Sequence, residues 1–222
     1  MSADTYTGEA TVGGPAAVRE LPGLVVSKLA VGEMDNNAYL LRDVDSNEAL
    51  LIDAATDAEA LLRMIGDADL RTVVTSHGHW DHHRALPDVV AATGAVTVAH
   101  PADAADLPVP VERTVQHGDT VRVGRHSLEV IHLRGHTPGS IALLWRGPGD
   151  TGPHLFTGDC LFPGGVGNTQ KDPQRFTSLL DDVEQRVFAP LPDETWVYPG
   201  HGKDTTLGTE RPHLSEWRSR GW

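Results

Sequence analysis

The segment SHGHWDHH, residues 76–83, places four histidines and one aspartate within eight positions. It follows a short β-branched run that predicts a strand. Because successive side chains of a strand alternate in direction, His77 and His79 can point to the same side. Asp81 and His82 follow at the turn into the next predicted helix, where the chain can face the same point. The pattern H-x-H-x-D-H should arise by chance roughly once in a few hundred chains of this composition, so it indicates a metal site. His83 extends the cluster beyond the pattern.

Three later segments each place a histidine or an aspartate beside a glycine, directly after a predicted strand. They are LRGHTPGS (133–140) with His136, FTGDCLF (156–162) with Asp159, and VYPGHG (197–202) with His201. Loops at one rim of a sheet are where α/β proteins build their sites. Together with the first segment they supply seven groups, which exceed the needs of one four-coordinate ion. We therefore expect two neighbouring divalent ions that share a carboxylate, zinc above all, with iron or manganese as alternatives.

The pattern of strands and helices has no break in composition, which favours one α/β domain over residues 21–222. Residues 1–20 are rich in Gly, Ala and Thr and are expected to form a flexible N-terminal arm. A helix is predicted from a capping box of Thr56 and Glu59 to Gly66, and others over 83–93 and 172–188. Strands are predicted over 24–31, 38–41, 49–52, 71–75, 96–99, 120–123, 128–133, 141–145, 154–157 and 195–198. The tail RPHLSEWRSRGW (211–222) contains Trp217 and Trp222 and could pack on the surface, form part of a lid or join a homodimer contact.

Composition narrows the class of partner. The formal net charge of −13 over 222 residues disfavours nucleic acid and anionic membranes, so a small-molecule substrate is expected. The single cysteine, Cys160, rules out an intrachain disulfide and suits a reducing cytoplasm. The first residues lack the basic and apolar regions of a secretory signal, and no apolar run approaches a membrane span. We expect a cytoplasmic protein.

The four motifs, in this order and spacing, resemble those of the metallo-β-lactamase superfamily, and most of all its glyoxalase II-like hydrolases. The resemblance covers about residues 24–201, and LLIDA (50–54) matches the strand that ends in an aspartate in this family. It implies an αββα sandwich of two mixed sheets flanked by helices, with Asp53 as a buried group behind the ligands. It also implies that one metal is bound by His77, His79 and His136, the other by Asp81, His82 and His201, and that Asp159 bridges them.

Such a centre implies hydrolysis by a hydroxide that bridges the two metals, with Asp81 accepting a hydrogen bond from it. The favoured substrate is a small thioester or ester. The stretch GGVGNT (164–169) lacks the cysteine and the basic residue that glyoxalase II enzymes carry there, which points away from glutathione. Arg134, beside the motif of His136, and Lys203, beyond His201, are candidates for substrate contact.

Other readings of the same motifs remain open. Persulfide dioxygenases share them and hold a single iron at the places of His77, His136 and Asp159. A lactonase, a β-lactamase-type hydrolase and a non-catalytic metal-binding relative are the further alternatives. The metal and its stoichiometry discriminate among several of these.

Overall fold

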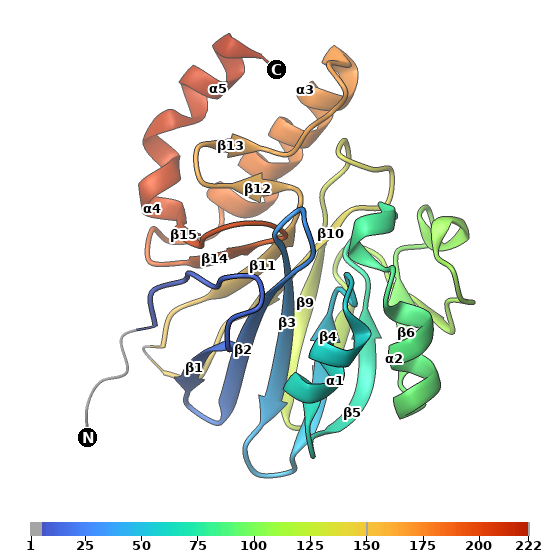
Figure 1. The fold of residues 1–222 in the computed structure, drawn as a ribbon. Coiled ribbons are helices and arrows are strands. Elements are labelled where there is room, and N and C mark those ends of the chain that lie inside the picture. Colours follow the sequence, from blue (N-terminus) through green and yellow to red (C-terminus); the bar gives the residue numbers. More distant parts are fainter. Residues whose placement is uncertain (1–5, 150, 222) are drawn as a thin grey trace.

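Two β-sheets packed face to face form the centre of the molecule (Figure 1), whose computed structural model describes residues 6–149 and 151–221. The first sheet has the strand order β1-β2-β3-β4-β5-β6-β7 and the second the order β15-β14-β11-β10-β9-β8. The strands of the first are β1 Ala17–Leu21, β2 Leu24–Val31, β3 Asn36–Asp43, β4 Glu48–Ile52, β5 Asp69–Val74, β6 Val96–Ala99 and β7 Arg113–Thr114. Those of the second are β8 Thr120–Val123, β9 His126–His132, β10 Ile141–Trp145, β11 His154–Gly158, β14 Trp196–Pro199 and β15 Thr205–Thr206.

Apolar runs in the strands follow from burial on both faces of each sheet. In β4, Leu50 and Ile52 point into the core between the two sheets, where they meet residues such as Leu143 and Phe156 of the second sheet. Leu51, between them in sequence, faces the opposite side and packs with Leu61 of the first helix. The continuous run LLI is therefore the signature of a strand with helices on one side and a sheet on the other.

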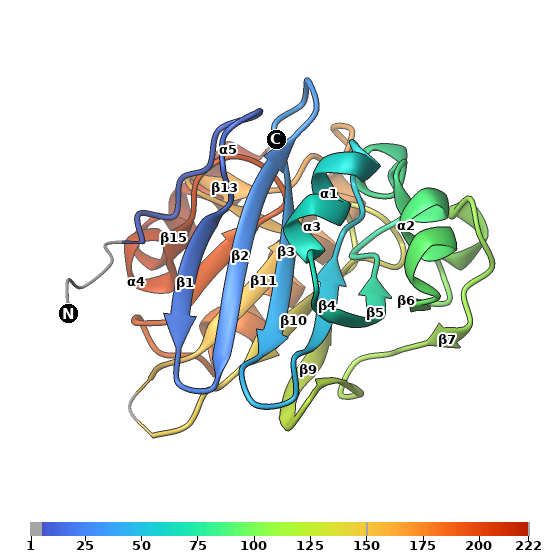
Figure 2. The same ribbon diagram turned by 60° about the horizontal axis from the view of Figure 1, so that its bottom comes forward.

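Helices cover the outer face of each sheet, which confirms the predicted αββα sandwich. α1 (Ala58–Ile65) and α2 (Leu86–Thr93) pack on the first sheet, visible in front of it in Figure 2. α3 (Pro173–Val183), α4 (Leu207–Glu210) and α5 (Leu214–Arg220) belong to the apolar cluster on the outer face of the second sheet. A small hairpin of β12 (Leu161–Phe162) and β13 (Gly165–Val166) lies between β11 and α3 in the chain.

The ten predicted strands are all present, with ends that differ by two residues at most. The predicted capping box at Thr56 is wrong, because Asp57 caps α1 by accepting a hydrogen bond from the amide of Ala60 at 3.1 Å. The predicted helix over 172–188 is α3 followed by a π-helical turn, Glu184–Phe188. The strands that sequence patterns missed are β1, β7, β12, β13 and β15, each only two to five residues long.

The N-terminal segment differs from the predicted loose arm. β1 pairs antiparallel with β2, with Ala17 opposite Lys28, and so extends the edge of the first sheet. Earlier still, Tyr6 donates a hydrogen bond from its hydroxyl to Asp204 Oδ2 at 2.8 Å. Apolar periodicity did not reveal these contacts because they depend on backbone pairing and on one aromatic anchor. Residues 1–5 lie outside the described part of the chain.

The C-terminal tail forms α5, whose Trp217 is 1% exposed within the apolar cluster on the second sheet. Trp222 lies outside the described residues. Within residues 6–149 and 151–221, no helix is long and apolar enough to cross a membrane. The sequence left three roles open for the tail: packing on the surface, part of a lid, or a homodimer contact. In the structure, Trp217 packs on the second sheet of its own chain.

Trp217→Ala is expected to lower the free energy of unfolding by about 3–5 kcal/mol, because it leaves a large cavity under α5. Urea denaturation followed by circular dichroism measures this loss. Val44→Ala, at an exposed position, is the control and should change stability by less than about 0.5 kcal/mol. A loss below about 1 kcal/mol for Trp217→Ala would contradict the packing described for α5.

His154, at the start of β11, gives a pH-dependent prediction. Burial, with a smaller effect of the Arg19 charge, lowers the pKa of His154 to about 3, against about 6.5 in an unfolded chain. The unfolded state therefore binds a proton below about pH 6.5 that the folded state does not, so this group costs stability as pH falls. The cost between pH 6 and pH 5 is about 1 kcal/mol.

His154→Phe should remove that contribution. The wild-type free energy of unfolding should fall by about 1 kcal/mol more than that of the variant between pH 6 and pH 5. Equal pH slopes in urea denaturation of the two proteins would show that His154 is protonated in the folded state at pH 5.

Candidate metal centre

The loops that follow β5, β9, β11 and β14 bring all seven predicted ligands together at one end of the two sheets. Their donor atoms form three overlapping groups whose members lie within 4.8 Å of one another. The groups consist of His77, His79 and His136; of His77, His82 and Asp159; and of Asp81, His82 and His201. Residues up to 124 positions apart in sequence thus share one small volume.

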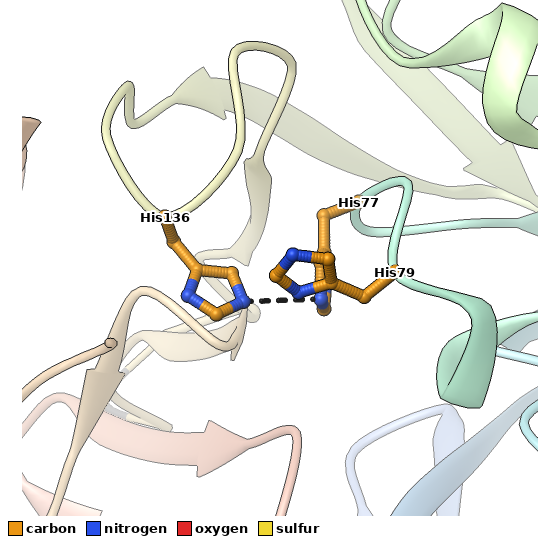
Figure 3. A group of neighbouring side chains, drawn as sticks. All are labelled: His77, His79 and His136. Carbon is orange, nitrogen blue, oxygen red and sulfur yellow. Dashed lines mark hydrogen bonds between the residues drawn. The ribbon is translucent and has the colours of Figure 1, made fainter. Parts of the chain in front are cut away.

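The first cluster is formed by His77, His79 and His136, drawn in Figure 3. The Nε2 atoms of His77 and His136 are 3.2 Å apart, and the His79 ring centroid lies 4.4 Å from that of His136. Two nitrogens that bind one zinc ion tetrahedrally at about 2.0–2.1 Å lie roughly 3.3 Å apart. The separation of the His77 and His136 nitrogens therefore fits a shared cation.

The second cluster is formed by Asp81, His82 and His201. The Nε2 atoms of His82 and His201 are 3.1 Å apart, and Asp81 Oδ2 lies 3.4 Å from His201 Nε2. Asp159 lies between the clusters, with Oδ1 3.3 Å from His82 Nε2 and Oδ2 3.6 Å from His136 Nε2. One carboxylate thus reaches histidines of both clusters, as a bridging ligand must.

Hydrogen bonds on the far side of the rings fix which nitrogen faces inward. Nδ1 of His136 donates to the Asn168 carbonyl and Nδ1 of His201 donates to the Met34 carbonyl, both at 2.8 Å. Nδ1 of His82 donates to Asp53 Oδ2 at 2.9 Å. Each of these rings therefore directs its Nε2 atom into the cluster, which is the arrangement that metal-binding histidines adopt.

Asp53 connects the two clusters from behind. Besides its bond to His82, its carboxylate accepts hydrogen bonds from the backbone amide and the hydroxyl of Ser76, each at 2.7 Å. The Ser76 hydroxyl in turn lies 3.0 Å from His77 Nδ1. Asp53 is 1% exposed and occupies a left-handed backbone conformation with φ of 60°. It therefore orients one histidine of each cluster and is not itself one of the converging ligands.

The protonation of the cluster follows from burial and from the carboxylates. Burial lowers the pKa of His136 to about 4 and lowers that of His77 well below its ordinary value, so both are neutral near pH 7. Burial also opposes the charged form of His201, but hydrogen bonds to Asp159 and Asp81 outweigh it and raise the pKa of His201 to about 10. A cation at the second cluster has to displace that proton, which makes its binding there pH-dependent.

Three supporting residues were not predicted from sequence. Asn36 Nδ2 donates to Asp81 Oδ2 at 2.9 Å. The Asp103 carboxylate accepts hydrogen bonds from the amides of Gly78 and Gly139 at 2.9 and 2.7 Å, so it ties two ligand loops together. Arg175 Nε donates to the carbonyl of Gly135 at 2.8 Å, next to His136. No motif marks these residues, because their role comes from segments that meet only in the folded chain.

Gly200, directly before His201, lies too close to the cluster to carry a side chain. A Cβ atom at this position would lie 2.1 Å from Asp159 Oδ1 and 2.8 Å from the Cε1 atom of His82. Only a residue without a side chain leaves room for the Asp159 carboxylate. The glycine of the YPGHG motif is therefore required by the close approach of the loop to the cluster.

The other sequence candidates lie outside the cluster. Arg134 donates from Nε and Nη2 to the Asp182 carboxylate, both at 2.8 Å, so its guanidinium is directed to α3. Lys203 is exposed, and within the described part of the chain no polar contact ties its side chain to the ligands. Cys160 is buried, and burial raises the pKa of its thiol, which makes it an inert core residue. His83 is buried next to the pattern, with Nε2 3.3 Å from the Gly78 carbonyl.

A buried ion pair supports the loop that carries His201. Lys28 Nζ, in the middle of β2, donates at 2.7 Å to Asp204 Oδ1 and to the carbonyls of Gly8 and Gly202. Burial lowers the pKa of Lys28 and raises the pKa of Asp204, so desolvation opposes the pair. Three short hydrogen bonds satisfy the ammonium group completely and anchor the chain directly after His201.

A family model described as the Metallo-beta-lactamase superfamily matches residues 31–201, and the chain belongs to this superfamily. The hydroxyacylglutathione hydrolase of Fuscovulum blasticum is 36% identical over 169 residues, which cover 75% of this chain and 62% of that protein. The solved structure of ETHE1 from Myxococcus xanthus is 33% identical, with a TM-score of 0.73 over 85% of this chain and 82% of that one. The solved structure of TTHA1623 in a di-iron-bound form is 30% identical, with a TM-score of 0.67 over 83% of this chain and 96% of that one. The predicted superfamily and fold are confirmed.

Asp53→Asn is expected to weaken metal binding about 10- to 100-fold, because the amide disturbs the bonds that orient His82 and the Ser76–His77 pair. Competition of the protein with a chromogenic chelator for Zn²⁺ measures the affinity. Asp67→Asn, an exposed change of the same chemistry, is the matched control. If both variants retain the wild-type affinity, the proposed orienting role of Asp53 is wrong.

Proposed function

We propose that this protein is a hydrolase that binds two divalent metal ions, with zinc as the expected metal, and cleaves a small thioester or related ester. What carries the proposal is the convergence of two histidine-rich clusters on one shared carboxylate, with the Nε2 atoms of His82 and His201 3.1 Å apart. When bound, the metals would supply a water of lowered pKa and polarise the carbonyl of the substrate. Hydrolytic chemistry is also general in the superfamily to which the chain belongs.

Asp81 is the residue that we expect to orient the attacking water. Burial opposes its ionised form, but a hydrogen bond to His201, the charge of His82 and the Asn36 amide lower the pKa of Asp81 below its ordinary value. The carboxylate is therefore ionised near neutral pH and can accept a hydrogen bond from the water. Asn36, which donates to Asp81 Oδ2, holds it in place.

The proposed reaction adds the oxygen of water to the acyl carbon and breaks the carbon–sulfur bond. The sulfur leaves as a thiol with one proton of the water, and the new carboxylic acid releases its proton to solvent. Neither cysteine nor serine is needed as a nucleophile, in accord with the buried and inert Cys160. For an ester, the carbon–oxygen bond breaks in the same way.

Thioesters are favoured because the chain is 36% identical to a hydroxyacylglutathione hydrolase. The residues that follow Asp159 nevertheless argue against glutathione as the thiol. Val166 and Asn168 have uncharged side chains, so neither position offers a cation to a substrate. Another low-molecular-weight thiol is the better candidate, and lactones and β-lactams are the next substrates to test.

A mononuclear-iron persulfide dioxygenase is the second candidate. His77, His136 and Asp159, the residues implied for its iron, lie together, with His136 Nε2 3.2 Å from His77 Nε2 and 3.6 Å from Asp159 Oδ2. It leaves the second cluster of Asp81, His82 and His201 without a metal, although the rings of His82 and His201 are oriented for one. The hydrolase accounts for both clusters and is therefore preferred.

Metal content per chain tests the proposal, by elemental analysis of wild type and Asp159→Ala purified without a chelator or histidine tag. Wild type should hold about two ions, and loss of the shared carboxylate should lower this content and reduce thioester hydrolysis by about 100-fold or more. Asp67→Ala, at an exposed position before β5, should match wild type.

One iron per chain, with oxygen uptake in the presence of a persulfide, would replace the hydrolase by the dioxygenase. A wild-type protein that takes up neither zinc nor iron would contradict both functions.

A further inference from the structure

A pocket of about 390 Å³ opens beside the second cluster, and its walls include Glu33, Met34, Asn36, Trp80, Asp81 and Arg84. Asp81 is one of the converging ligands, and Asn36 donates to its carboxylate. The pocket therefore continues the candidate metal centre outward. A substrate whose carbonyl lies at the clusters can extend into it.

Two exposed apolar side chains stand at this pocket. Met34 is 49% exposed and Trp80 is 55% exposed, more than any other large hydrophobic side chain in the described residues. Met34 lies in the turn between β2 and β3, and Trp80 lies within the H-x-H-x-D-H segment. Exposed apolar groups that flank a pocket at a functional site are typical of ligand contact.

Arg84 supplies a positive charge on the same wall. Its Cζ atom lies 4.8 Å from the centroid of the Trp80 ring, which holds the guanidinium over the indole. Other arginines pair with carboxylates at 2.8 Å or less, as Arg63, Arg71 and Arg134 do. By contrast, no carboxylate of residues 6–149 and 151–221 lies within 4.0 Å of the guanidinium nitrogens of Arg84.

The lack of a carboxylate near Arg84 among the described residues is notable, because the chain has 31 acidic and 18 basic residues and an acidic partner is easily found. A guanidinium that stays available at the wall of a pocket is a good donor to a carboxylate. Besides Asp81, the acidic residue that lines this pocket is Glu33. It places an opposing charge there and does not neutralise Arg84 through an ion pair.

We propose that this pocket recognises a substrate that carries a carboxylate at the end of an apolar segment. The segment lies against Trp80 and Met34, and the carboxylate pairs with Arg84. This inference rests on the proposed function and narrows its substrate class to anionic thioesters or esters. The carboxylate can belong to the acyl group or to the thiol, and the test below separates these two sources.

The test compares kcat/KM for two matched pairs of thioesters. The first pair is S-succinyl and S-butanoyl propanethiol, which differ in charge on the acyl side. The second is S-acetyl 3-mercaptopropanoate and S-acetyl propanethiol, which differ on the thiol side. Wild type should prefer the charged member of one pair by about tenfold, and that pair identifies the source.

Substitutions of Arg84 should change this preference in a graded way. Arg84→Met keeps the apolar stem and should bring the ratio of charged to neutral substrate close to one, while Arg84→Lys should retain part of it. Glu33→Gln removes the opposing charge and should raise the ratio. Arg71→Met, at an exposed arginine paired with Asp69, is the matched control and should keep the wild-type ratio.

A binding measurement keeps the inference testable without turnover. Calorimetric titration of the zinc-loaded protein should show tighter binding of succinate than of butanoate in wild type and equal binding in Arg84→Met. Hydrolysis of both members of each pair at equal efficiency by wild type would overturn the inference and leave the proposed function intact. No hydrolysis of any ester, with the succinate preference retained, would overturn the proposed function and support the pocket as a carboxylate site. Absence of both ester hydrolysis and the succinate preference would overturn the proposed function and the inference about the pocket.

Discussion

The inward orientation of the imidazole rings is the constraint on which the rest of this structure depends. Rings that direct their Nε2 atoms to common points need an acceptor behind each Nδ1 to hold that orientation. The chain provides these acceptors from unrelated segments: Asp53 behind His82, the Asn168 carbonyl behind His136, and the Met34 carbonyl behind His201. A change in the packing of any of these segments would turn a ring away from the cluster.

The sandwich meets this constraint by placing four strand ends at one end of two sheets and by fastening their loops to one another. Asp103 bonds the loop of His77 to that of His136, and the Lys28–Asp204 pair fastens the loop after His201 to β2. These polar groups are buried and satisfied, so they add rigidity where an unpaired group would cost stability. The apolar cores on either side of each sheet supply the free energy that this buried polar network does not.

The outer part of the site has a different character. The ligand cluster is largely buried and tightly bonded, whereas Trp80, Met34 and Arg84 are exposed around a pocket that opens to solvent. The proposed chemistry requires a fixed geometry of the converging side chains, while recognition of a small molecule requires accessible surface. The segment 76–84 serves both needs, because its ligands turn inward and Trp80 and Arg84 turn outward.

Much of the site was predictable because its ligands lie in short motifs, where local geometry decides how neighbouring side chains are placed. The strand-to-turn pattern of SHGHWDH is sufficient to indicate a metal site, and the apolar runs indicated nearly all longer strands. The supporting residues Asn36, Asp103 and Arg175 could not be predicted, because each acts on a segment at least 25 positions away. The same holds for the N-terminal segment, whose order depends on β2 and on Asp204.

The sequence by itself thus determined the superfamily, the alternation of buried faces and the identity of the converging side chains. Only the tertiary structure decided which nitrogen of each ring faces inward and that Arg134 is bound to Asp182. It also decided that Arg84 lies at a pocket with no carboxylate partner among the described residues. The physical reason is that hydrogen bonds and ion pairs act over a few ångströms in space. Spacing along the chain does not report such proximity when the partners come from different strands.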